Sequence, residues 1–167
     1  MATQAPKGYS RLQIALHWII ALLIAVQILY HDPMEEAWDA VRDGLAVPAE
    51  VTFGVTVHVV VGVSVLLLAL LRLGVRFTRG APALPAEEPA PLRLAANATH
   101  VVLYILMIAI PLGGLAAWVG GVKPAAGIHG LAANVLFWLV VLHILGALYQ
   151  RFVLKSDVMT RMVTPQK

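Results

Sequence analysis

The chain has 167 residues, of which 60% are apolar and only 13% are charged, and its mean hydropathy is +0.83. A soluble domain is typically about 45–50% apolar and about 25% charged, so this composition argues against a water-soluble globule. The sequence contains no Cys, which excludes disulfides, thiolate zinc sites, iron–sulfur clusters and covalently attached haem. The net charge of +3 comes from few residues, and no basic run alternates with aromatic side chains, so nucleic-acid binding is not expected.

Four apolar stretches are separated by polar or Gly/Pro-rich segments, and they cover approximately residues 12–30, 51–75, 97–119 and 128–153. Each is about long enough to cross a hydrocarbon core of about 30 Å at about 1.5 Å per residue. A backbone in lipid must satisfy its own hydrogen bonds, so each stretch is predicted to be a helix. We therefore expect an all-α protein with one domain over residues 1–167, built as an integral membrane four-helix bundle.

The distribution of basic residues predicts the orientation of this bundle. Ten of the twelve Lys and Arg residues fall before the first stretch, between the second and third, or after the fourth. The other two, Arg42 and Lys123, fall in the remaining loops, and six acidic residues lie between Asp32 and Glu50. The positive-inside rule then places both termini in the cytoplasm and the acidic loop outside. This loop is either an ordinary solvated segment or a docking surface for a basic protein.

Five of the six His residues lie in or at the ends of the apolar stretches, namely His17, His58, His100, His129 and His143. An ionisable residue at membrane depth indicates a function, because leaving it without a partner in lipid is costly. For any one of them, a core His bonded to a backbone carbonyl is the ordinary structural alternative. As a set they are harder to explain in that way.

Four of these His residues form two pairs at two depths. His129 and His143 are 14 residues apart, which places them within about 40° of one helix face and about 21 Å apart along it. His17 should lie level with His143, and His58 level with His129. Two imidazoles at each depth suit two haem b groups, because filling both axial positions of the iron favours electron transfer over oxygen binding.

Two other features bear on this interpretation. A metal transporter or a proton relay would normally have carboxylates at the same depth, and the four stretches contain no Asp or Glu. Small residues lie four positions from each of the four His residues, and they are Ala21, Gly54, Gly62, Ala133 and Ala147. They either leave room for a porphyrin or simply favour close helix packing in the membrane.

The opening segment YSRLQIALHW, from Tyr9 to Trp18, resembles the start of the bacterial cytochrome b561 family. Further similar motifs are HxxxGxS from His58, HxxxY from His100, IPxxGL from Ile110 and the His spacing of the last stretch. The resemblance covers nearly the whole chain. It implies a small four-helix cytochrome of the bacterial inner membrane that binds two haem b groups.

The resemblance also implies roles for the His residues and a reaction. It places His17 and His143 on a cytoplasmic-side haem, and His58 and His129 on an outer haem. Within the family the chain is similar to superoxide oxidases, which pass electrons from periplasmic superoxide to ubiquinone. The alternative is an electron-transfer subunit that links a periplasmic dehydrogenase, hydrogenase or peroxidase to the quinone pool.

The sequence does not decide between alternative roles for four further residues, which are His100, Arg11, Arg72 and Lys123. His100 could replace a haem ligand, but we expect it to contact a haem propionate or the quinone. Arg11 and Arg72 can reach propionates from the cytoplasmic interface, or they anchor the helices there. Lys123 could attract superoxide near the outer haem, although six acidic residues against two basic ones on that face oppose an anionic substrate.

Overall fold

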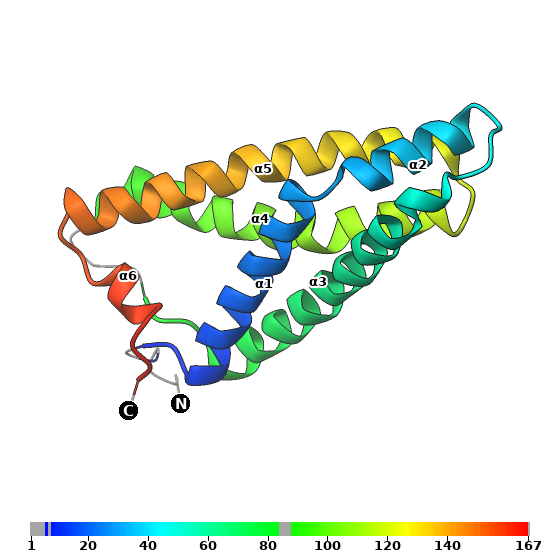
Figure 1. The fold of residues 1–167 in the computed structure, drawn as a ribbon. Coiled ribbons are helices and arrows are strands. Elements are labelled where there is room, and N and C mark those ends of the chain that lie inside the picture. The colour runs from blue at the N-terminus through cyan, green and yellow to red at the C-terminus, as the bar shows by residue number, and fades with distance from the viewer. Residues whose placement is uncertain (1–5, 7, 84–87, 167) are drawn as a thin grey trace.

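The structure is a computed structural model, and it describes residues 6, 8–83 and 88–166. All the regular secondary structure of these residues is helical. Four helices are long and apolar enough to cross a membrane, and they are α1 (Arg11–Leu29), α3 (Thr52–Arg79), α4 (Ala90–Trp118) and α5 (Lys123–Phe152) (Figure 1). The prediction of an all-α membrane protein with four spanning helices is therefore confirmed.

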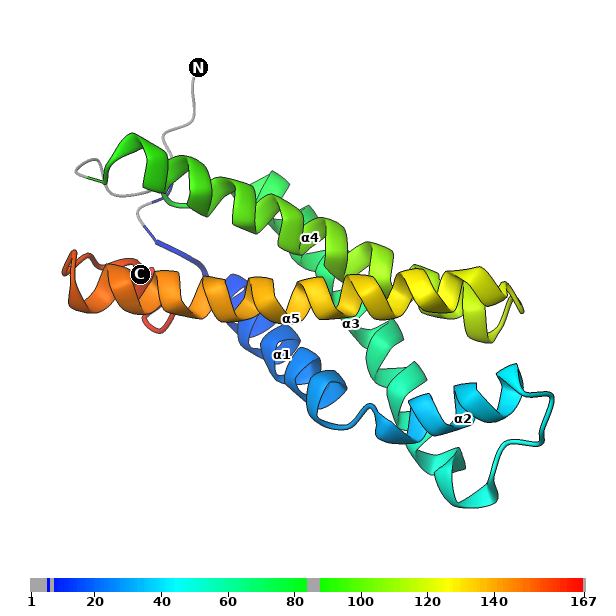
Figure 2. The same ribbon diagram turned by 90° about the horizontal axis from the view of Figure 1, so that it is seen from above.

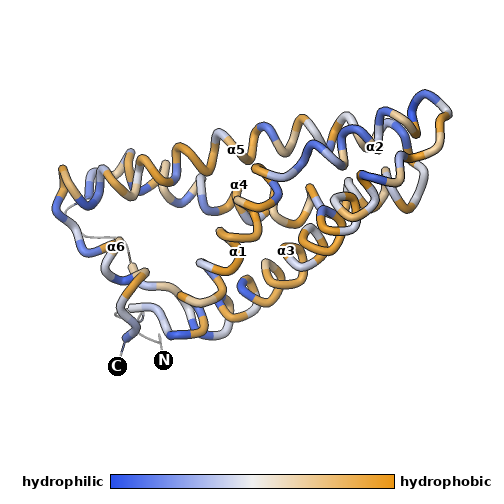
Figure 3. The backbone as a smooth tube through the Cα atoms, viewed as in Figure 1, coloured by the Kyte–Doolittle hydropathy of each residue, from blue (hydrophilic) through white to orange (hydrophobic). Residues whose placement is uncertain are grey.

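Two of the helices begin earlier than the apolar stretches indicate. The helix α4 begins at Ala90 instead of near residue 97, and α5 begins at Lys123 instead of near residue 128. Each has a Pro in its first turn, where the missing N–H costs nothing because first-turn N–H groups have no partner within the helix. Hydropathy marks only the apolar part of each helix, and Figure 3 shows polar residues concentrated at the helix ends and in α2.

The acidic segment after α1 is partly helical, which the sequence analysis did not predict. The helix α2 (Asp32–Arg42) and the short 3-10 helix η1 (Ala49–Val51) lead into α3. Ala37 and Met34 of α2 pack with Val51, Val55 and Trp118. The other face of α2 exposes acidic side chains, which are those of Asp32, Glu35, Glu36 and Asp39.

The spanning helices pack as a chain of neighbours, α1 on α3, α3 on α4 and α4 on α5. Figures 1 and 2 show α4 and α5 side by side, with α1 and α3 crossing them at an angle. Among the described residues, α5 is closely packed with neither α1 nor α3. All four helices contribute to one buried cluster, here called the central core, which consists of Ile20, Ile24, Val65, Ala69, Met107 and Leu136.

The described chain begins and ends at the same end of the bundle, here called the terminal end. The Gln166 N–H donates to the Tyr9 carbonyl at 2.9 Å, and Trp18 Nε1 donates to the Met162 carbonyl at 2.9 Å. The helix α6 (Val158–Arg161) lies between the end of α5 and the start of α1 (Figure 1). The opposite end holds α2 and is called the α2 end. Which of the two ends faces the cytoplasm stays a prediction from the basic residues.

Candidate functional site

Two pairs of His rings meet inside the bundle, one near each end. The ring centroids of His17 and His143 are 6.3 Å apart toward the terminal end, and those of His58 and His129 are 6.1 Å apart toward the α2 end. All four side chains are half-buried. The structure thus brings together the same pairs that the helix positions predict to be level.

The separations fit two imidazoles on opposite faces of one metal ion. An imidazole nitrogen binds a first-row metal at about 2.0–2.1 Å, so the ring centroids of two axial ligands lie about 6.4 Å apart. The measured values of 6.1 and 6.3 Å agree with this distance. The rings come from helices that are not closely packed against each other. The residues present therefore fit a bis-imidazole haem at both positions.

The ring of His129 is held in one orientation by the backbone of α4. Its Nδ1 lies 2.8 Å from the Ile110 carbonyl oxygen. A carbonyl only accepts hydrogen bonds, so Nδ1 must carry the proton and donate it. The neutral imidazole then keeps its lone pair on Nε2, which is the state that a metal ligand requires.

Gly114 makes the approach of His129 to α4 possible. A Cβ at Gly114 would lie 3.0 Å from Cε1 and 3.1 Å from Nδ1 of the His129 ring. Its neighbour Gly113 is different, because a Cβ there would meet only the His129 Cβ at 3.9 Å. The absence of a side chain at Gly114 thus leaves the space that the ring needs to reach the Ile110 carbonyl.

His58 presents a different environment. Its Nδ1 is buried and has no hydrogen-bond partner among the described residues. The His58 carbonyl accepts from Gln27 Nε2 at 2.9 Å. A buried polar atom without a partner is costly, and a bound group between α3 and α5 would supply one.

Two of the small residues near His58 serve helix packing. A Cβ at Gly62 would come within 3.0 Å of Gln27 Nε2 on α1. A Cβ at Gly54 would overlap the ring of Pro33 on α2. At both glycines, therefore, the close packing of helices explains the small residue without reference to a cofactor.

His100 joins the pair at the terminal end as a third ring. Its centroid is 5.3 Å from that of His143, which is about 1 Å less than the separation of His17 and His143. Two imidazoles on opposite faces of one iron need a centroid separation of about 6.4 Å. The spacing of His100 and His143 therefore suits an additional polar group beside the pair better than a second axial ligand.

Arg72 lies close to the same group of rings. One of its guanidinium nitrogens donates to the Gln13 carbonyl at 2.7 Å, and Gln13 lies four residues before His17 on α1. The guanidinium has five N–H groups, so others remain for an anionic partner. Arg11, in contrast, is exposed at the start of α1.

Both polar atoms of the Gln13 side chain form hydrogen bonds within the protein. Its Oε1 accepts from the Ser10 backbone N–H at 2.9 Å, and its Nε2 donates to the Gly80 carbonyl at 2.9 Å. The Gln13 backbone N–H in turn lies 3.3 Å from Ser10 Oγ, which completes a capping box at the start of α1. Gln13 thus fixes the start of α1 against the end of α3.

The central core lies between the two His pairs. Leu136 is seven residues from both His129 and His143 on α5 and is buried. Ile20 of α1 and Val65 of α3 pack in the same cluster. A layer of apolar side chains therefore separates the two His pairs.

The α2 end carries the acidic face of α2 and little free positive charge. Arg42 is paired with Asp39 at 2.7 Å and with Asp43 at 3.2 Å. Lys123 is exposed at the first position of α5, six residues before His129. Lys123 thus adds positive charge near His129 through one exposed side chain.

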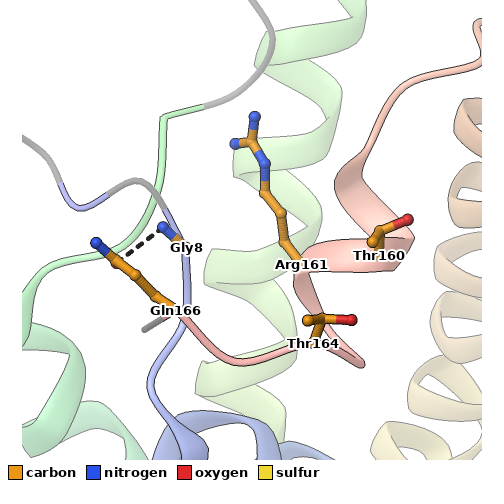
Figure 4. Close-up of a pocket in the computed structure, with 5 residues that line it drawn as sticks. All are labelled: Gly8, Thr160, Arg161, Thr164 and Gln166. Carbon is orange, nitrogen blue, oxygen red and sulfur yellow. Dashed lines mark hydrogen bonds between the residues drawn. The ribbon is translucent and has the colours of Figure 1, made fainter.

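One cavity of about 230 Å³ lies at the terminal end, away from both His pairs. Figure 4 shows its lining, which consists of Gly8, Thr160, Arg161, Thr164 and Gln166. Arg161 is held there by Asp157 at 2.8 Å and by the Ala83 carbonyl at 2.8 Å. None of the lining residues is a His, so this cavity is separate from the candidate site.

A buried carboxylate that the sequence did not predict lies near the terminal end. Glu88, in the Pro- and Ala-rich segment between the second and third apolar stretches, is only 5% exposed. It accepts a hydrogen bond from Gln150 Nε2, and Gln150 Oε1 accepts from Ser156 Oγ at 2.7 Å. A Glu in a Pro- and Ala-rich segment normally indicates solvent, so only the tertiary structure reveals this burial.

Comparison with known proteins identifies the family. A match to the family described as prokaryotic cytochrome b561 extends over residues 8–165. The chain belongs to this family. It is accordingly a multi-pass protein of the bacterial inner membrane that binds b-type haem and transfers electrons.

Individual relatives of this cytochrome b561 protein match over nearly their whole length. A protein of Cereibacter sphaeroides named cytochrome b562 is 43% identical, with 98% of this chain and 99% of the relative covered. A protein of Yersinia pestis named "Probable superoxide oxidase CybB" is 28% identical over 96% of this chain and 98% of the relative. Cytochrome b561 homolog 1 of Escherichia coli is 27% identical, with 95% of this chain and 98% of the relative covered.

Proposed function

We propose that this cytochrome b561 protein binds two haem b groups and carries electrons between them across the membrane. His17 and His143 hold one haem toward the terminal end, and His58 and His129 hold the other toward the α2 end. The observation that supports this most strongly is the pair of ring separations, 6.3 and 6.1 Å, on helices that are not closely packed. Bound haem supplies reversible one-electron chemistry at its iron.

Three features of the chain favour electron transfer at these sites. A haem held by two imidazoles at either site would be suited to electron transfer rather than to oxygen binding. The Ile110 carbonyl orients His129 through Nδ1. The central core separates the two sites with apolar side chains.

For the electron acceptor we propose ubiquinone, bound near the terminal end in the cytoplasmic half of the membrane. His100 stands beside His143 without the spacing of an axial ligand, so its ring can donate a hydrogen bond to a quinone carbonyl. Arg72 and Arg11 pair with haem propionates at this end, since guanidinium binds carboxylate in a bidentate way. Reduction of one quinone to quinol takes up two electrons and two protons.

For the electron donor we propose superoxide. A relative at 28% identity carries the name of a probable superoxide oxidase, and Lys123 provides a positive charge near the outer site. Two superoxide ions each give one electron and leave as dioxygen. These two electrons, with two protons from the cytoplasm, convert one ubiquinone into ubiquinol.

A basic redox protein is a second candidate donor. The acidic face of α2 favours it, because Asp32, Glu35 and Glu36 are exposed on the helix that covers the outer end. Such a face attracts a cationic partner and repels an anion. In that case the chain serves a periplasmic dehydrogenase, hydrogenase or peroxidase as its link to quinone.

A pulse of superoxide given to the purified, oxidised protein under anaerobic conditions separates these donors. We expect the reduced b-type bands to rise rapidly, to be abolished when superoxide dismutase is added first, and to decay when ubiquinone follows. The optical spectrum records each step. Bands that respond to dithionite but not to superoxide would contradict the superoxide assignment and leave the protein donor.

A further inference from the structure

We propose that the last part of the described chain holds His17 and His143 at the separation that a haem iron needs. Residues 156–166, here called the C-terminal strap, include α6 and run from the end of α5 back to the start of α1 (Figure 1). Trp18 and Arg161 fix this strap in place and are positioning residues for the cofactor. The inference rests on the proposed function, because it takes His17 and His143 as ligands of one haem.

The pair at the terminal end lacks the direct support that the other pair has. His17 belongs to α1 and His143 to α5, and these two helices are not closely packed against each other. The ring of His129 is bonded to the Ile110 carbonyl, whereas no ring hydrogen bond is found for His17 or His143 among the described residues. The 6.3 Å between their ring centroids therefore depends on how α1 and α5 are held relative to each other.

The strap is attached to α5 through Gln150. Ser156 Oγ donates to Gln150 Oε1 at 2.7 Å, and the Ser156 N–H donates to the Gln150 carbonyl at 2.9 Å. Gln150 Nε2 in turn donates to the buried carboxylate of Glu88, so the strap, α5 and the segment before α4 meet at one side chain. Gln150 lies seven residues after His143, which is about two turns along the same face of α5. The attachment is thus in line with the ligand.

The strap is attached to α1 beside the other ligand of the pair. Trp18 directly follows His17, and its Nε1 donates to the Met162 carbonyl at 2.9 Å. Nearer the end of the strap, the Gln166 N–H donates to the Tyr9 carbonyl at 2.9 Å. The strap therefore connects α5 to α1 at the terminal end, where the two helices do not pack closely themselves.

The middle of the strap is also held. Arg161 donates to Asp157 from Nε at 2.8 Å and to the Ala83 carbonyl, in the segment after α3, from a second nitrogen at 2.8 Å. Lys155, just before the strap, has a φ of 52°. A residue with a side chain adopts this left-handed conformation only where surrounding contacts impose it. The strap is therefore a fixed connection and not a loose tail.

A fixed separation of the two rings favours haem binding. Ligands that the protein already holds in place lose little freedom when the cofactor binds, so the cofactor binds more tightly. Loosening the strap should therefore weaken binding of the haem at the terminal end. The His58–His129 site should not respond, because the Ile110 carbonyl and the packing of α2 on α3 support it at the other end.

Transfer of haem from the oxidised holoprotein to excess apomyoglobin measures how fast each haem leaves. Trp18→Phe removes the N–H donor to the strap and keeps an aromatic ring beside His17. We expect the terminal-end haem to leave about fivefold faster, which is the typical effect of one lost hydrogen bond. Arg161→Gln removes the ion pair with Asp157 and should act in the same direction. The double variant should exceed either single one, and the haem at the α2 end should leave at the wild-type rate in all three.

Trp138→Phe and Arg151→Gln are the matched controls. They make the same two chemical changes at exposed positions of α5, where neither side chain forms a hydrogen bond among the described residues. Both haems should leave these variants at the wild-type rate. The variants His17→Ala and His129→Ala, each left with one haem under the proposed function, assign the two phases of haem loss.

The ferric electron paramagnetic resonance spectrum gives a second readout. The signal of a low-spin iron with two imidazole ligands depends on the angle between the ring planes, and the planes of His17 and His143 are 65° apart. In Trp18→Phe the terminal-end signal should shift or broaden while the other signal stays unchanged. A general loss of fold stability would not change one signal alone.

Three results would overturn the inference. They are wild-type haem loss and spectra in all strap variants, an effect confined to the haem at the α2 end, and faster loss of both haems by the same factor. Each leaves the proposed function standing if the wild type holds two haems. If a strap variant is purified with one haem, the inference requires the terminal-end haem to be the missing one. Fewer than two haems per wild-type chain would instead overturn the proposed function, and this inference with it.

Discussion

Replacing His58 or His129 with Ala should halve the haem content, from two groups to one per chain. Each substitution removes one of two axial ligands at the α2 end, where the rings are 6.1 Å apart. The central core separates this site from the His17–His143 site, so the second haem should remain. His17→Ala and His143→Ala should likewise remove only the haem at the terminal end. Pyridine haemochrome spectra of the purified variants, normalised to protein, measure the content.

Two further variants act as controls for this result. His31→Ala removes an exposed ring outside the spanning helices and should leave both haems in place. His100→Ala should also retain two haems, because the 5.3 Å spacing of its ring to His143 does not suit an axial pair. Haem loss in His100→Ala together with full haem content in His17→Ala would show that the pairing at the terminal end is wrong.

Charge reversal on α2 should change the rate of haem reduction in opposite directions for the two candidate donors. Glu35→Lys combined with Glu36→Lys converts two exposed acidic positions into basic ones. Reduction by superoxide should become faster, and reduction by a cationic redox protein slower, each by about tenfold or more at low salt. Stopped-flow absorbance of the b-type bands gives both rates.

Ionic strength provides the control for that experiment. Exposed charges are screened over about 10 Å at 0.1 M salt and over about 3 Å at 1 M. The differences between variant and wild type should therefore shrink as salt is added. Rates that do not depend on the substitution at low salt would contradict a role for the α2 face in donor approach.

The spanning helices and the pairing of the His rings follow from the sequence for simple physical reasons. Lipid forces the backbone to form helices, so length and hydropathy are sufficient to find them. A fixed rise per residue then places His129 and His143 at two depths of α5. The structure brings His17 beside His143 and His58 beside His129. The ring centroids of the two pairs are 6.3 and 6.1 Å apart, close to the separation expected for two ligands of one haem iron.

The features that were missed depend on contacts that no residue pattern encodes. A backbone carbonyl such as that of Ile110 has no side-chain signature, so its bond to His129 appears only in three dimensions. The close packing at Gly54 and Gly62 depends on where Pro33 and Gln27 fall on neighbouring helices. From the sequence alone, either close helix packing or the need for space beside a cofactor could explain these glycines.

The helix α2 is a different case, because a signal for it was present. Its apolar residues Met34, Ala37, Trp38 and Val41 follow the spacing of one helix face. Asp32 and Pro33 at its start are also typical of a first helical turn. The dense acidic charge led to the expectation of a loop, whereas it occupies the exposed face of an amphipathic helix.

The central claim is that two haem b groups are each held by two imidazoles. The most direct test is the haem-to-protein ratio of the purified wild-type protein, measured together with the response of its dithionite-reduced spectrum to carbon monoxide. We expect two haems per chain and an unchanged spectrum, because neither iron has an open axial position. One haem per chain, or a spectrum that shifts when carbon monoxide binds, would contradict the account.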